Sequence, residues 1–289
     1  MALSLQEILI WCREEQKEFW EYMLYDDMRE RGITREESFS YMESIFDTME
    51  QTVKTYRPER LSGSGLVGAE GGKMEVYYEK GDALCGSFMG KAMTTALKMA
   101  ESNACMRRIV AAPTAGSCGV IPAVLLPYYE MKKPDKQQLL KALYVAGAIG
   151  EVIAERASIS GAEGGCQAEI GSASAMAAGA LTFLEGGSGE QICHAAALAL
   201  KGLLGLVCDP VAGLVEIPCV KRNVLGTVNA ISCTDMAMAG IKSRIPPDEV
   251  IDAMQEVGAK MDSAFRETAA GGLAATRTGQ EIAQRIMKE

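Results

Sequence analysis

The sequence predicts a mainly α-helical protein, a compact multi-helix domain in which small side chains let the helices pack closely. Two observations predict this fold class. Apolar residues recur at helical spacing in long stretches, and the central segments are rich in Ala, Gly and Ser. The only convincing β signal is one alternating stretch, residues 73–79, which predicts a short strand or β-hairpin.

The first sixty residues carry clear helix signals. Residues 4–28 place apolar side chains at helical spacing, and Thr34 with Glu37 forms a capping box that begins another helix. A glycine-rich stretch, 61–72, follows. We take it as the boundary between an N-terminal helical cap, 1–60, and a main domain, 61–289, although the two could pack as a single domain.

The rest of the chain alternates between helices and short loops. Pro122 suits the first turn of a helix that follows the loop APTAGSCG, and Ser188 with Gln191 caps another helix. The other helices are expected at about 87–103, 136–155, 168–184, 188–207 and 218–239, with a last one beginning at Pro247.

Composition and charge narrow the class of protein. The chain has 289 residues, of which 48% are hydrophobic, so it can bury a sizeable core. Its net charge of −9 and the lack of a basic patch argue against a nucleic-acid partner. The N-terminus does not resemble a signal peptide, and the most apolar run, 195–207, is too short to span a bilayer. We therefore expect a cytoplasmic protein with no membrane partner.

Three cysteines form the clearest candidate site. Cys166, Cys208 and Cys219 each interrupt a run of small and apolar residues beside a Gly, a Pro or both, where a chain turns. Three thiolates on separate turns can hold a metal centre and leave one coordination position vacant, which a catalytic metal needs. Their spacing matches no zinc-finger or ferredoxin pattern, so the fold would have to gather them. The alternative is that they are buried and act as small hydrophobic side chains.

The other cysteines and the histidine limit the kind of site. No Cys-x-x-Cys pair occurs, and the odd number of cysteines argues against a disulfide framework. Cys219 follows Pro218 in a helical first turn, where the helix dipole is expected to lower its pKa. The single histidine, His194, excludes a His-rich mononuclear site. Core filling is expected of Cys12, Cys85, Cys105, Cys193 and Cys233, whereas Cys118 is an exception because it lies in the candidate substrate loop.

Three segments closely resemble a known family. APTAGSCGVIPAVL, GAEGGCQAEIGSASAMAA and CDPVAGLVEIPCVKRN are similar to the alpha chain of the iron–sulfur-dependent L-serine dehydratases, and the resemblance runs from about Gly86 to Thr276. The segment ESNACMRRIVAAPTAGS resembles the two-subunit branch of the family, in which the alpha chain works with a separate beta chain. The resemblance implies a lyase that converts L-serine to pyruvate and ammonia. It also implies a [4Fe-4S] cluster held by Cys166, Cys208 and Cys219 in the main domain.

Three cysteines for four irons leave one iron without a thiolate ligand, and the resemblance implies that this iron acts as a Lewis acid on the serine hydroxyl. Single-chain members of the family often end in a cysteine that folds back towards the cluster. This chain ends TRTGQEIAQRIMKE. The resting occupant of the fourth iron is therefore left open between water, another ligand and substrate.

Substrate binding is expected at a loop that precedes a helix. Free backbone N–H groups at a helix N-terminus suit a carboxylate, although an ordinary capped helix start would have the same sequence. The residues concerned are Thr114, Ala115, Gly116 and Ser117.

Two further residues are expected on the same helix face as Cys219. Arg222 and Asn223 follow it by three and four residues, which is about one helical turn. Arg222 could bind a substrate carboxylate through both arms of its guanidinium, or it could lie at the surface. Lys221 points elsewhere on the helix and is expected to face solvent.

The sequence identifies no catalytic base. His194 lies in the first turns of a capped, Ala-rich helix, where a packed or capping role explains it better. The family resemblance implies that a Ser-Ser-His-Thr motif on the beta part supplies a histidine, and that motif is absent here. We therefore expect the alpha chain alone to be inactive or weakly active.

Two other functions stay open at this point. The fold also resembles that of cluster-dependent L-cysteine desulfidases, in which sulfide leaves instead of hydroxide, and the motifs discriminate poorly between the two. The second alternative is a non-catalytic helical scaffold subunit with buried thiols and no metal. A pyridoxal-phosphate enzyme is not expected, because no alternating βαβ pattern occurs.

Overall fold

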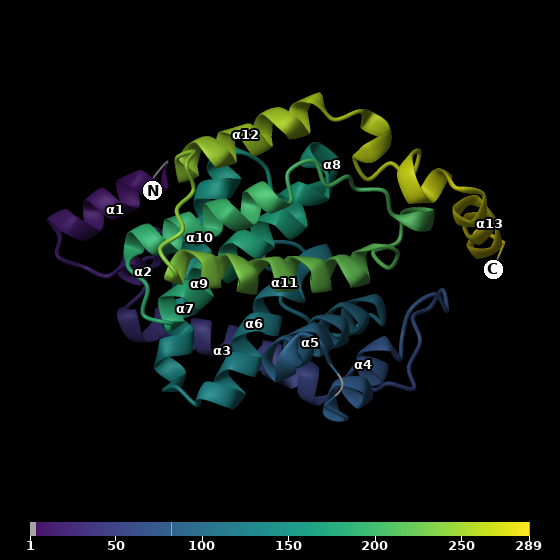
Figure 1. Cartoon of the computed structure of the whole chain (residues 1–289), viewed down its shortest axis with the longest axis horizontal. Helices are drawn as coiled ribbons and strands as arrows, with labels where there is room; N and C mark the ends of the chain where they lie inside the picture. The colour runs from purple at the N-terminus through teal and green to yellow at the C-terminus, as the bar shows by residue number, and fades with distance from the viewer. Residues whose placement is uncertain (1–3, 82, 289) are drawn as a thin grey trace.

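The computed structural model describes residues 4–81 and 83–288, and the prediction of a mainly helical fold is confirmed (Figure 1). This part of the chain contains no β-strand. None of its helices combines the length with the apolar character that crossing a lipid bilayer requires. The helices are α1 (Leu5–Glu14), α2 (Phe19–Arg31), α3 (Arg35–Lys54), α4 (Glu70–Glu79), α5 (Gly86–Ala104), α6 (Val120–Lys132), α7 (Lys136–Arg156), α8 (Gly161–Gly164), α9 (Ser172–Leu184), α10 (Gly189–Gly202), α11 (Cys219–Met238), α12 (Pro247–Lys260) and α13 (Arg277–Ile286).

Helix α9 forms the centre of the fold. It contacts α6, α7, α10 and α11, and its residues from Ser172 to Thr182 are all buried. Its side chains are mostly small, so neighbouring helices approach it closely. A Cβ atom at Gly179 would lie 2.1 Å from the Cδ1 atom of Ile149 on α7. The small residues that dominate this segment therefore permit the contact between α7 and α9.

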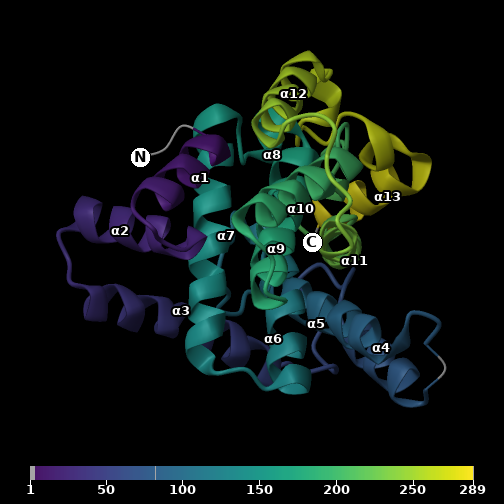
Figure 2. The same ribbon diagram turned by 60° about the vertical axis from the view of Figure 1, so that its left-hand side comes forward.

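The three N-terminal helices pack to one side of α7, on the left of Figure 2. Leu5, Phe19 and Phe46 belong to the same buried apolar cluster as Ile149 of α7. The proposed cap, 1–60, thus shares a core with the proposed main domain, 61–289, over their described residues.

Residues 4–28 form two helices where the periodicity suggested one. The chain turns between α1 and α2, and Gln16 there has a φ of 55°. Glu18 then begins α2 through a capping box with Glu21. An apolar stripe that continues through such a turn cannot by itself reveal the break.

The predicted β-hairpin at 73–79 is wrong, because these residues lie in helix α4, which packs against α5. Glu101 of α5 accepts hydrogen bonds from the backbone N–H groups of Glu70 (2.8 Å) and Gly71 (3.2 Å). These N–H groups have no partner within a helix, so a carboxylate there stabilises the helix start. The contact lies 31 residues away in sequence, beyond the reach of a local alternating pattern.

Most other boundaries agree with the predictions. The capping boxes of Thr34 with Glu37 and Ser188 with Gln191 are both formed. Helix α10 ends at Gly202, several residues before the expected end, because the chain leaves it in a turn that leads to Cys208. The sequence did not predict α13.

Glu151 on α7 makes the stability of this core pH-dependent. Burial, together with the carboxylates of Asp26 and Glu30, raises the pKa of Glu151 to about 7. Because this pKa lies above the ordinary value of 4.5, the protonated carboxyl stabilises the fold fully below pH 4.5, and this contribution is lost as the pH rises through 7. We expect Glu151→Gln to raise the free energy of unfolding by about 1 kcal/mol at pH 8, after allowance for solvent screening.

Urea unfolding at pH 4.5 and pH 8 measures this difference. Glu155→Gln is the matched control, since Glu155 is exposed on the same helix. An equal effect of Glu151→Gln at both pH values would contradict the account.

Candidate metal centre

Cys166 lies where the chain bends sharply between α8 and α9. Gly165 precedes it with a φ of 75°, in the left-handed region that favours glycine, and a Cβ there would lie 2.9 Å from the carbonyl oxygen of Leu206. Cys166 then begins η2, a single π-helical turn (Gln167–Gly171). Such turns are frequent at functional sites. The turn brings the side chain of Glu169 to the same side as the Cys166 thiol.

The segment that carries Cys208 is anchored to the C-terminal part of the chain. The N–H group of Cys208 donates to the carbonyl oxygen of Phe265, and its own carbonyl oxygen accepts from the N–H group of Glu267, each at 2.8 Å. Cys219 is the first residue of α11, so its thiol is placed by the start of a long helix.

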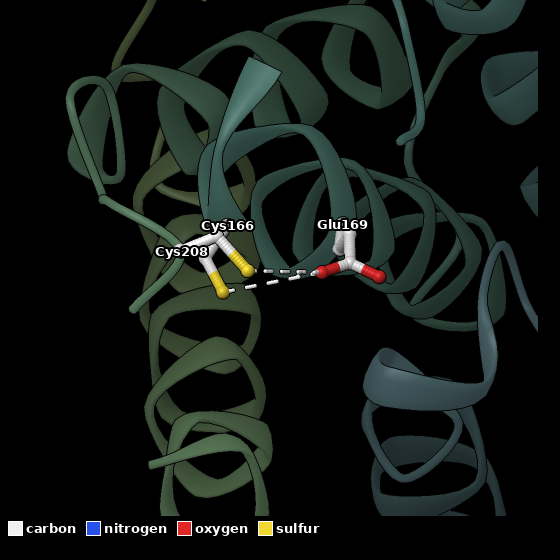
Figure 3. Close-up of side chains that lie close together, drawn as sticks. All are labelled: Cys166, Glu169 and Cys208. Atoms are coloured by element: carbon white, nitrogen blue, oxygen red, sulfur yellow. Dashed lines mark hydrogen bonds between the residues drawn. The ribbon is translucent and has the colours of Figure 1, made fainter. Parts of the chain in front are cut away.

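These three segments converge on one small cavity of about 20 Å³. Its lining includes Cys166, Cys208 and Cys219, which are 2%, 2% and 8% exposed. One oxygen of Glu169, Oε2, lies 4.0 Å from the sulfur of Cys166 and 3.9 Å from that of Cys208 (Figure 3). The three turns singled out in the sequence therefore meet in space. Cys166, Glu169 and Cys208 offer ligand atoms that all lie within 4.8 Å of one another.

The thiols of this cavity are not equivalent. The pKa of Cys166 is lowered, chiefly because Cys208 donates a hydrogen bond to its sulfur and further because Arg222 lies beside it. The same hydrogen bond, together with burial, raises the pKa of Cys208. Burial raises the pKa of Cys219 to about 12, so the expectation that the helix dipole lowers it is wrong. Desolvation of the thiolate outweighs the dipole at this position.

Arg222 holds the cysteine-bearing segments together. Its side chain is 13% exposed, so it is not a surface arginine. One guanidinium nitrogen, Nη1, donates to the carbonyl oxygen of Val207 at 2.8 Å and to the sulfur of Cys166 at 3.4 Å. The other, Nη2, forms a 2.8 Å ion pair with Asp209. The guanidinium expected to bind substrate is thus already engaged in positioning the cysteines.

Asn223 fixes the predicted substrate loop beside Cys219. Its side-chain nitrogen donates to the carbonyl oxygens of Gly116 (2.8 Å) and Cys219 (3.0 Å), and its oxygen accepts from the N–H group of Gly119 (2.8 Å). The residue is 1% exposed. Asn223 therefore serves the loop and the ligand segment, and its exposed neighbour Lys221 faces solvent as expected, in an ion pair with Glu70.

The predicted substrate loop is a short 3-10 turn, η1 (Ala115–Ser117), capped by Thr114. The Thr114 hydroxyl donates to Oε1 of Glu169 at 2.8 Å, and Gly116 lines the cysteine cavity. The turn thus lies directly against the cysteine site. Glu169 connects the two, because one of its oxygens faces the sulfurs and the other faces Thr114.

The patterns considered in the sequence did not indicate Glu169 as a residue of the site. It lies three residues after Cys166, a spacing that puts two side chains on one face of a helical turn. The signal was therefore present in GGCQAEIG. Burial raises the pKa of Glu169, partly offset by the hydrogen bond from Thr114.

His194 lies at a different place in the fold. It lines a larger cavity of about 960 Å³ bordered by α1, α10 and the start of α12, and this cavity shares no lining residue with the cysteine site. Burial lowers the pKa of His194. The small cavity is the stronger candidate for a metal centre than the cavity lined by His194, because the three cysteine sulfurs, which are soft ligands, gather there.

Comparison with known proteins identifies the family. The family model for the serine dehydratase alpha chain matches residues 14–274. The chain belongs to the serine dehydratase alpha-chain family. A protein of Bacillus subtilis named probable L-serine dehydratase, alpha chain, is 46% identical over 99% of this chain and 95% of its own length. The L-serine dehydratase alpha chain of Peptoniphilus asaccharolyticus is 40% identical over 100% and 99%.

A third relative differs in length from these two. L-serine dehydratase TdcG of Escherichia coli is 49% identical over 62% of this chain, and the match covers only 40% of TdcG itself. The matched part of this chain therefore corresponds to less than half of a longer relative.

The ligand atoms of the cysteine site suit an iron–sulfur cluster. Three thiol sulfurs are soft ligands of the kind that hold such clusters, whereas Mg²⁺ or Ca²⁺ would require oxygen ligands. The cavity of about 20 Å³ has room for roughly one water. Binding of a cluster there would therefore require the lining side chains to move outward.

Asn223 offers a test of how the loop is held. We expect Asn223→Ala to lower the free energy of unfolding by about 2 kcal/mol, because it leaves the buried N–H group of Gly119 without its acceptor. Thermal unfolding measures the change. Lys221→Ala, on the same helix but exposed, is expected to stay within about 0.5 kcal/mol of the native chain. Equal effects of the two substitutions would show that Asn223 is not a structural link.

Proposed function

We propose that this chain is the alpha chain of an L-serine dehydratase, which converts L-serine to pyruvate and ammonia with a [4Fe-4S] cluster held by Cys166, Cys208 and Cys219. The observation that carries the proposal is the convergence of three buried cysteines, from separate turns, on one cavity beside the loop 114–117. Two relatives named as L-serine dehydratase alpha chains match nearly the whole chain and support it.

The chain's own residues would bind and orient the substrate. When bound, the cluster supplies a Lewis acid that weakens the bond between the substrate carbon and its hydroxyl group. The turn Thr114–Ser117 offers backbone N–H and hydroxyl groups for the substrate carboxylate. Arg222 holds Cys166 in place, and Asn223 holds this turn. The buried setting strengthens each of these hydrogen bonds.

Proton removal from the α-carbon needs a base that this site does not identify. His194 lines another cavity, and Glu169 is engaged by Thr114. The match covers only 40% of TdcG, so more than half of that relative lies outside the matched region. We propose that a beta chain supplies the remaining part of the active site, the base included, and we keep the cytoplasm as the predicted location.

Substitution of each cysteine tests the ligand set. We expect Cys→Ser at positions 166, 208 and 219 to abolish binding of iron after anaerobic reconstitution with iron and sulfide, because each removes a thiolate ligand. The matched controls are the buried Cys118, Cys193 and Cys233, which line no part of the cysteine cavity and are expected to keep their iron. The measurement is iron and sulfide content per chain. A native chain that stays colourless and iron-free would favour the scaffold alternative instead.

Substrate and subunit requirements form a separate test. We expect pyruvate from L-serine at a high rate only when the alpha chain is combined with a beta chain, because the alpha chain alone lacks the base. Pyruvate formation from L-serine, L-threonine and L-cysteine is measured with and without the beta chain. Preference for L-cysteine with release of sulfide would identify a desulfidase. Full serine turnover by the reconstituted alpha chain alone would contradict the need for a partner.

A further inference from the structure

We propose that Glu169 is an internal placeholder ligand: in the resting enzyme its carboxylate occupies the iron that has no cysteine, and it yields this position when a substrate carboxylate arrives. The inference rests on the proposed cluster and adds a role for a residue of this chain. It also gives an occupant to the position that the sequence left open.

The first argument is the contact between Glu169 and the cysteine sulfurs. Oε2 lies at nearly equal distances, 4.0 and 3.9 Å, from the sulfurs of Cys166 and Cys208 (Figure 3). The three ligand atoms fall within 4.8 Å of one another, which is closer than ligands of different irons in a [4Fe-4S] cluster lie, so they must move apart when the cluster binds. Glu169 is nevertheless the carboxylate that already faces both sulfurs. A carboxylate oxygen is an accepted iron ligand, although a harder one than thiolate.

The second argument is the room made for this carboxylate. A Cβ atom at Gly161 would lie 2.6 Å from Oε2 of Glu169, and one at Gly116 would lie 3.3 Å from Oε1. The first distance is too short for any side chain, and the second leaves little space. Two segments that are far apart in the sequence thus lack side chains where the Glu169 carboxylate lies.

The third argument is competition for the same donor. Oε1 of Glu169 accepts the hydrogen bond from the Thr114 hydroxyl at 2.8 Å, and Thr114 begins the turn proposed to bind the substrate carboxylate. Two carboxylates brought together in a buried pocket repel each other strongly. Binding of substrate at this turn therefore requires Glu169 to leave Thr114, and with it the sulfurs.

A second acidic residue, Glu267, lines the same cavity and is the alternative carboxylate ligand. Glu267 is linked to Cys208 through its backbone N–H group, which donates to the Cys208 carbonyl oxygen at 2.8 Å. Glu169, in contrast, approaches the sulfurs with its carboxylate. The geometry therefore favours Glu169 over Glu267 as the ligand.

Mössbauer spectroscopy of the full chain, reconstituted anaerobically with ⁵⁷Fe and sulfide, tests the proposal. In Glu169→Gln we expect the same iron content as in the native chain, but a changed signal from about one quarter of the iron, because one iron in four loses its carboxylate. Added L-serine is expected to change that signal in the native chain. We further expect loss of iron in air to become about tenfold faster in Glu169→Gln, as is typical when support of a metal site is removed.

Affinity for substrate separates a placeholder from a substrate-binding residue. A placeholder competes with substrate, so its removal lowers the L-serine concentration needed to change the iron signal. A group that binds the substrate directly has the opposite effect, so a higher L-serine requirement in Glu169→Gln would overturn the proposal.

Three controls complete the design. Glu163→Gln changes an exposed acid near the same loop and is expected to leave the spectrum unchanged. Glu267→Gln tests the rival acid, and a changed signal in this variant alone overturns the proposal. Glu169→Asp keeps the charge but draws the oxygens back, so it carries the test if circular dichroism shows that Glu169→Gln is unfolded.

The outcomes separate this inference from the function on which it rests. A native chain that binds a cluster, with a resting spectrum that Glu169→Gln leaves unchanged, refutes the placeholder role alone. A native chain that binds no iron and sulfide refutes the proposed function, and the placeholder role with it.

Discussion

One largely buried guanidinium holds the candidate site together. Arg222 binds the sulfur of Cys166, the carbonyl oxygen of Val207 and the carboxylate of Asp209, and Asp209 in turn accepts from the N–H group of Leu273. A single side chain therefore connects the segments before α9, after α10 and before α13 to helix α11. The planar fork of an arginine suits this role, since it presents several donors in a fixed geometry. The buried charges are tolerated because their acceptors and donors are satisfied together.

The same pocket concentrates groups that would bind a cation. Three thiols and the carboxyl group of Glu169 face one small space, and burial helps to raise the pKa values of Cys208, Cys219 and Glu169. A metal centre stabilises thiolate and carboxylate where water cannot, so metal binding and proton release are coupled at such a site. This coupling is the physical link between the raised pKa values of Cys208 and Cys219 and the proposed cluster.

The helical core provides the rigid support for this arrangement. The ligands lie on turns and helix starts, whereas α9 and α11 behind them are tightly packed: a Cβ at Gly226 of α11 would lie 2.9 Å from a side-chain atom of Ile170 in η2. Turns held by packed helices can place side chains accurately while leaving one side of the site open to change. The position of Glu169 in a π-helical turn between Cys166 and α9 follows the same principle.

The features that were predictable depend on neighbours within a few residues. Most of the helices followed from apolar periodicity, and the caps at Thr34 and Ser188 from residues three positions further on. The cysteines of the site stood out because each interrupts a run of small residues beside a turn. The β-hairpin at 73–79 was wrong, because Glu101 stabilises α4 from another helix.

Contacts between distant segments decided the rest. Arg222 could be placed near Cys219 by helical spacing, but its partner Cys166 lies 56 residues away. The raised pKa of Cys219 reflects burial, and the link between Thr114 and Glu169 spans 55 residues. Burial, and the partner that a polar group finds there, belong to the packed chain as a whole. A pattern read along the sequence can name the ligands of such a site, while their protonation and their mutual positions arise only when the segments fold together.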